Sequence, residues 1–177
     1  MTNKIEYLIL KNLISDENYT RKVLPFIKSE YFTINEEQIV FKLIDNFVKK
    51  YNKNPTLEIL EVSLQESNHS ESLYNDCVAV LKNLEQKEQI NTEWLEVETE
   101  KFCKGKAVYN AIVKSITILE GKDKQHSKEG IPSLLQEALG VCFDSSVGHD
   151  YIDDASMRYD FYHRVEHRIP FDIDQIS

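Results

Sequence analysis

The sequence contains few residues that interrupt regular backbone: five glycines and four prolines among 177 residues. Most of them lie at the ends of apolar patterns or between them, and no stretch alternates apolar and polar residues for long enough to predict a β-strand. These absences exclude a sandwich or barrel of short strands joined by glycine-rich turns. The apolar residues recur instead at steps of three and four, and we predict an all-α fold.

Cysteine is also scarce, and long apolar runs are missing. Cys77, Cys103 and Cys142 are odd in number, widely spaced and each set in a helical pattern. This predicts buried thiols in a reducing compartment and no disulfide. No run approaches the roughly 18 apolar residues of a membrane span, and the amino terminus has no apolar signal core. We therefore expect a soluble, cytoplasmic protein with no membrane partner.

Positive charge is in short supply, with 21 Lys and Arg residues against 30 Asp and Glu residues and a net charge of -9. A surface that binds many phosphates must carry the opposite sign, so tight binding of nucleic acid by this chain alone is disfavoured. Apolar residues make up 41% of the chain. That is enough for the core of one domain, or of a small domain with an appendage.

Helical periodicity dominates the first half of the chain. Pro25 should interrupt the second helix, because proline removes a hydrogen bond and clashes with the preceding turn. Thr33 followed by Glu36 matches a capping box at the start of the third helix. The expected helices are residues 5–14, a short one that Asp16 caps, one from Thr33 to about Lys50, residues 56–65 and residues 70–84.

Residues 92–119 hold one helical register for about eight turns. Their apolar positions form two adjacent rows with a seven-residue repeat: Leu95, Phe102, Tyr109 and Ile116, and Gly105, Ile112 and Leu119. A polar, glycine-bounded run at 121–130 follows, and residues 131–143 are again amphipathic. We predict a helical hairpin with the polar run as its tip and the two rows as its seam.

A connector at 144–149 leads to one last predicted helix, from about Asp150 to His167, which Pro170 stops. Its apolar stripe consists of Ile152, Ala155, Tyr159 and Tyr162. Two interpretations remain open: the stripe packs on this chain's own body, or it docks in a groove of another subunit.

The sharpest catalytic motif is His163-x-x-Glu166-His167, which has the form of a zinc site. Zinc requires a third protein ligand, however, and only ten residues follow His167. Cationic side chains at a helix carboxyl end explain the motif more simply. A phosphate loop is absent, because the sequence around Gly105 lacks the first glycine and the hydroxyl residue. We therefore expect no catalytic residue, cofactor site or metal site in this chain.

Several short blocks occur in the order found in a known family. They include Ser29-Glu-Tyr-Phe32, Trp94-Leu95, Ile131-Pro132 and the specific block Phe143-Asp-Ser-x-Val-Gly-His-Asp150, followed by Asp153-Asp154. Together they resemble the amino-terminal region of the replicative DNA helicases of T-even-type phages, which are DnaB-like hexameric helicases. The resemblance runs from about Leu8 to Pro170.

The resemblance implies four parts: a helical globule at 1–90, a helical hairpin at 91–145, a connector and linker helix at 146–169, and, at 170–177, the start of a RecA-like ATPase domain that this chain lacks. It also implies a dimeric or hexameric collar that docks primase, with a helicase loader as a further partner. ATP, Mg²⁺ and single-stranded DNA would be bound by the full-length ring of the parent helicase, in an infected bacterial host.

The residues expected at the subunit or partner interface are Phe102, Tyr109 and Ile112 on the hairpin and Ile152, Tyr159 and Tyr162 on the linker helix. For the first three, the alternative is that they fill the hairpin's own seam. Two other functions remain open: a stand-alone adaptor or loader that binds a helicase, and a small zinc hydrolase that uses His163, Glu166 and His167.

Overall fold

Every regular element in the described part of the chain is a helix, which confirms the all-α prediction. The computed structural model describes residues 4–67, 69–85, 90–123 and 126–143, and Met1–Phe143 form one compact unit. The predicted last helix lies outside the described residues. So do its candidate residues Ile152, Tyr159, Tyr162, His163, Glu166 and His167.

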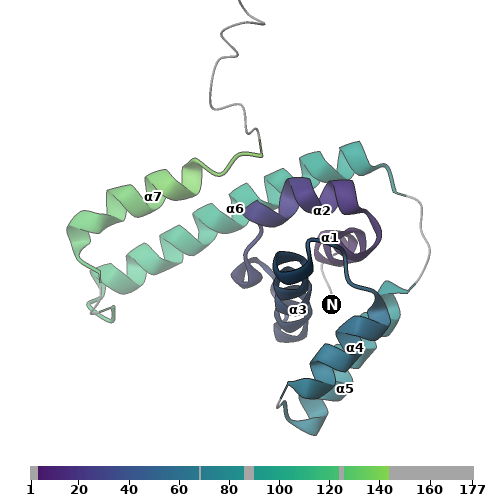
Figure 1. The fold of residues 1–177 in the computed structure, drawn as a ribbon. Helices are drawn as coiled ribbons and strands as arrows, with labels where there is room; N and C mark the ends of the chain where they lie inside the picture. The colour runs from purple at the N-terminus through teal and green to yellow at the C-terminus, as the bar shows by residue number, and fades with distance from the viewer. Residues whose placement is uncertain (1–3, 68, 86–89, 124–125, 144–177) are drawn as a thin grey trace, which may run out of the picture. The chain divides into compact units, whose positions relative to one another are not determined.

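The helices follow one another closely along the chain (Figure 1). In chain order they are α1 (Lys4–Ser15), α2 (Glu17–Val23), the 3-10 turns η1 (Leu24–Phe26) and η2 (Ser29–Tyr31), α3 (Asn35–Tyr51), α4 (Leu57–Glu66), α5 (Glu71–Leu84), α6 (Thr92–Leu119), the 3-10 turn η3 (Lys128–Gly130) and α7 (Ile131–Leu139).

Side chains cap the starts of four helices. The side-chain oxygen before the helix accepts a hydrogen bond from a backbone N–H three positions on, at Asp16, Thr56, Ser70 and Asn91. The predicted capping box of Thr33 and Glu36 is wrong, because α3 begins at Asn35 after an N-cap residue that makes no side-chain hydrogen bond. Thr33 donates instead to the buried carboxylate of Glu6, which is a stronger acceptor because it is charged.

The core surrounds α1, which packs against α2, α3, α5 and α6. Ile9, Leu10 and Leu13 of α1 are completely buried. A buried hydrogen bond of 2.6 Å between the Tyr19 hydroxyl and Thr99 Oγ1 joins α2 to α6. The long helix α6 is therefore built into the core and cannot be displaced without exposing it.

Helix α6 also forms a hairpin with α7 (Figure 1). The side chains that α6 buries are mostly small and advance mostly in steps of four: Leu95, Thr99, Cys103, Ala107, Ala111, Ser115 and Ile118. Small side chains along such a ridge allow a second helix to approach closely. The predicted boundary between globule and hairpin at residue 90 stays a prediction.

The predicted seam of the hairpin is wrong over the second half of α6. Leu95 is buried and Phe102 is half-buried, as a seam requires. The other members are exposed: Gly105, Tyr109, Ile112, Ile116 and Leu119. Their rows repeat every 3.5 residues on average whereas the buried residues repeat every four, so the two patterns rotate away from each other along the helix.

The second helix of the hairpin ends earlier than its apolar pattern indicated. Helix α7 stops at Leu139, before Gly140, although the amphipathic segment continues to Phe143. Phe143 is nevertheless buried, and its ring stacks on that of Phe26 with 4.8 Å between the ring centroids. The chain is thus anchored to the core just beyond the hairpin.

The prediction of buried cysteines is correct for Cys77 and Cys103 and wrong for Cys142. Burial raises the pKa of the Cys103 thiol to about 12 and that of Cys77 to about 11, so both are protonated at neutral pH. Cys142 is exposed because it lies beyond the end of α7, where the helical periodicity no longer applies.

A buried carboxylate connects α1 to the segment just before α3 and to α6. Glu6 is completely buried, and it accepts hydrogen bonds from the Thr33 N–H at 3.0 Å and the Thr33 hydroxyl at 2.9 Å. Lys106 Nζ lies 3.3 Å from the same carboxylate. Burial alone raises the pKa of Glu6, but hydrogen bonds with Thr33 and Glu37 and the Lys106 charge outweigh it and hold that pKa below its ordinary value.

The lowered pKa of Glu6 predicts acid sensitivity. Its contribution to the free energy of unfolding is present above the pKa of the unfolded chain, about 4.3, and is lost as the pH falls through the lower folded value. Glu6→Gln should cost about 1–3 kcal/mol at pH 7, because an amide satisfies Thr33 and Lys106 less well. Urea unfolding at about pH 7 and pH 3 measures this, with the exposed Glu30→Gln as control. If Glu6→Gln lowered the free energy of unfolding by the same amount at both pH values, the account would be contradicted.

Candidate interaction surface

One side of α6 carries large apolar side chains that the described residues leave uncovered. We call this side the outer face of α6; it consists of Gly105, Tyr109, Ile112, Val113, Ile116 and Leu119. Apart from the glycine, these residues are between 42% and 63% exposed. Apart from Val113, which directly follows Ile112, they are spaced in steps of three and four, and this gathers them along one side of the helix over about four turns.

Covering the outer face with a partner would bury apolar surface and release free energy. Complete burial of one large apolar side chain is worth about 1.5–3 kcal/mol, and these five side chains remain roughly half in water. Burying the parts that are still exposed would release a free energy on the order of 5 kcal/mol in total. Contiguous apolar surface on a soluble protein typically marks an interaction site.

Two of the residues predicted at an interface, Tyr109 and Ile112, lie on the outer face. Among the described residues they do not fill the seam of the hairpin, which was the alternative for them. Ile116 and Leu119 join them there, although the sequence analysis assigned both to the seam. The signal that separates the two faces is the four-residue row of small side chains from Cys103 to Ser115.

The third hairpin candidate, Phe102, lies at the border of the core. The ring centroid of Phe102 is 6.2 Å from that of Phe32, and Lys106 Nζ lies 5.5 Å from the Phe102 centroid. Phe102 is half-buried by these contacts, so only part of its ring remains for a partner. Its role at an interface stays a prediction, as do those of the linker-helix candidates outside the described residues.

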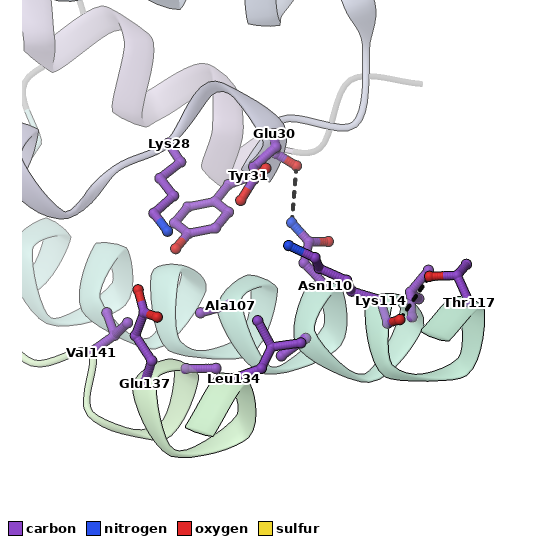
Figure 2. A pocket seen from close by; sticks show the side chains of 13 residues that line it. Lys28, Glu30, Tyr31, Ala107, Asn110, Lys114, Thr117, Leu134, Glu137 and Val141 are labelled. Atoms are coloured by element: carbon purple, nitrogen blue, oxygen red, sulfur yellow. Dashed lines mark hydrogen bonds between the residues drawn. The ribbon is translucent and has the colours of Figure 1, made fainter. Parts of the chain in front are cut away.

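A cleft of about 570 Å³ opens where η2 meets the hairpin (Figure 2). We call it the Tyr31 cleft. It is lined by Lys28, Glu30, Tyr31, Ala107, Asn110, Ala111, Val113, Lys114, Thr117, Leu134, Glu137, Ala138 and Val141. Val113 belongs both to the cleft and to the outer face, whereas the other cleft residues on α6 lie on a different side of the helix from the outer face. The sequence analysis did not find this cleft, because η2 and α6 are about 80 residues apart.

Several polar groups face the Tyr31 cleft. Tyr31 is 1% exposed, and burial, with the nearby charges of Glu30 and Glu137, raises its pKa to about 12. Its hydroxyl is therefore protonated, and no hydrogen bond from it occurs within the described part of the chain. Lys28 and Lys114 likewise have no ion-pair partner among the described residues, whereas Asn110 donates to the Glu30 carbonyl at 3.4 Å. The lining of the cleft thus carries a hydroxyl, two ammonium groups and the carboxylates of Glu30 and Glu137.

No group of three or more His, Cys, Asp or Glu side chains within the described ranges could hold a metal ion. The zinc motif of His163, Glu166 and His167 lies outside those ranges, so the zinc hypothesis is untested. Among the helices that are described, none has the length and apolarity needed to cross a membrane.

Comparison with known proteins identifies a relative. No family model matches the chain. The chain is 34% identical over 172 residues to a protein described as a DnaB-like replicative helicase, from Enterobacteria phage T4. The match covers 93% of this chain and 36% of that helicase, so the chain spans about a third of the length of its relative. The predicted resemblance is therefore confirmed: this chain is a sequence relative of the DnaB-like replicative helicases.

Proposed function

We propose that this chain is an assembly module of a phage replicative helicase, through which subunits associate into an amino-terminal collar. The observation that carries the proposal is the outer face of α6, a contiguous apolar surface in an otherwise acidic, well-packed helical unit. The sequence relationship to a replicative helicase supports it. ATP hydrolysis, Mg²⁺ binding and DNA unwinding would belong to a RecA-like domain of the parent protein, and we expect no catalysis from this chain.

The spacing of the outer face supports a helix as its binding partner. Gly105, Tyr109, Ile112, Ile116 and Leu119 follow one another at steps of 4, 3, 4 and 3, which is the spacing of a seam between two helices that cross at about 20°. A second copy of the chain presents the same seam, so a two-fold contact would cover both faces at once. The net charge of -9 fits this role, because the interface is apolar and needs no phosphate contact.

The proposal predicts that one charge on the outer face abolishes self-association. Ile112→Asp should weaken the dimer by about a hundredfold or more, because dimerisation would bury an unpaired carboxylate. Val62→Asp is the matched control, since Val62 is 55% exposed on α4, away from the outer face. Sedimentation equilibrium over a concentration series measures both variants. A wild-type chain that stays monomeric at several hundred micromolar, or equal association of Ile112→Asp, would contradict the proposal.

The proposal includes primase as a second partner, and we assign it to the Tyr31 cleft. This assignment is supported by the ammonium groups of Lys28 and Lys114, which have no ion-pair partner within the described ranges. They would suit a peptide segment that carries a carboxylate beside an apolar side chain. Apart from Val113, which belongs to both, the residues of the cleft on α6 lie on a different side of the helix from those of the outer face. A collar subunit could therefore hold its neighbour and primase at the same time.

Reversal of one charge in the cleft should separate the two functions. Lys114→Glu should lower the affinity for the primase of the same phage by about tenfold or more, because a like charge would face the bound carboxylate. Its self-association should equal that of the wild type. Lys42→Glu, an exposed lysine on α3, serves as control. Titration calorimetry with purified primase measures both. Unchanged primase affinity in Lys114→Glu would refute the assignment to the cleft.

A further inference from the structure

Gly105 occupies the interior of α6, where a glycine is unfavourable. Relative to alanine, glycine lowers helix stability because its backbone loses more conformational freedom on folding. No special backbone conformation explains it, since positive φ among the glycines that the structure describes is found at Gly121 and not at Gly105. A Cβ atom built on Gly105 would meet no heavy atom within 4 Å apart from its chain neighbours and the backbone of its own helix. Within the described part of the chain, nothing requires the missing side chain.

The position of Gly105 on α6 suggests why a glycine stands there. Gly105 lies one turn before Tyr109 and in line with the rest of the outer face, so it forms a notch beside a row of large apolar side chains. The lysines around it are held by other groups: Lys101 pairs with Glu98 at 2.7 Å and Lys104 with Glu100 at 2.6 Å. Both ion pairs draw these long side chains toward the preceding turn and leave the notch open.

We infer that Gly105 is the point at which a helix of a second copy approaches the α6 backbone, with a large side chain of that copy's outer face seated over it. The inference rests on the proposed self-association through the outer face. A second copy fits the notch because the same face that has one missing side chain also has large ones, Ile112, Ile116 and Leu119. The face is therefore complementary to itself in size as well as in polarity.

This role predicts that a substitution at Gly105 changes the stability of the monomer and the strength of self-association in opposite directions. Gly105→Ala should raise the unfolding midpoint of the monomer by about 2–4 °C, because alanine favours the helix and its Cβ has open space. The same variant should weaken self-association by about tenfold, and Gly105→Leu should weaken it further, because the added atoms hold the second helix away. Asn46→Ala on α3 is the control: it is exposed, and it should change stability without changing association.

Thermal unfolding is followed by circular dichroism at a concentration below the dissociation constant, since association itself stabilises the folded chain. Sedimentation equilibrium gives the association constants. Equal association of the wild type, Gly105→Ala and Gly105→Leu would overturn the inference. If Ile112→Asp nevertheless abolishes association, the proposed function stands and only the role of Gly105 falls. If Ile112→Asp has no effect either, the proposed function falls as well.

Discussion

The rest of the structure depends on which side of α6 is buried. A straight helix of 28 residues is long enough to serve both the core and the hairpin, and it cannot rotate one half without the other. Its small side chains, from Cys103 to Ser115, allow α7 to pack closely. Once that row is buried, helical geometry places Tyr109, Ile112 and Ile116 on the opposite side. The apolar outer face is thus a consequence of how the hairpin packs.

Polar contacts hold α6 in this orientation. Glu6 is buried and contacts Thr33 and Lys106, so α1, the segment just before α3 and α6 share one charge-assisted network. The hydrogen bond between Tyr19 and Thr99 adds a second link from α2. Such contacts lose their partners if α6 turns about its axis, whereas apolar contacts adapt more readily. They therefore favour one rotational setting of the helix that carries the candidate interface.

The positions of most helices could be predicted from the sequence, whereas the faces that these helices bury could not. The bounds of α6 agree with those predicted, because its periodicity is long and capped at Asn91. The seam was misassigned because large residues every 3.5 positions outweighed the smaller Ala107 and Ala111, which bury less area but permit closer packing. The capping box at Thr33 failed because Glu6, 27 residues away, competes for the same groups. The Tyr31 cleft depends on contacts between segments that are still farther apart in the sequence, η2 and α6, which no local pattern records.

The central claim is that the outer face of α6 contacts a second copy of the chain. Methyl NMR of isoleucine-labelled protein over a concentration series tests it most directly, because Ile112 and Ile116 lie on that face whereas Ile9 and Ile44 are fully buried in the core. The account predicts that the signals of Ile112 and Ile116 shift or broaden as the protein self-associates, while those of Ile9 and Ile44 stay constant. Association with unchanged Ile112 and Ile116 signals, or no association at any concentration, would contradict it.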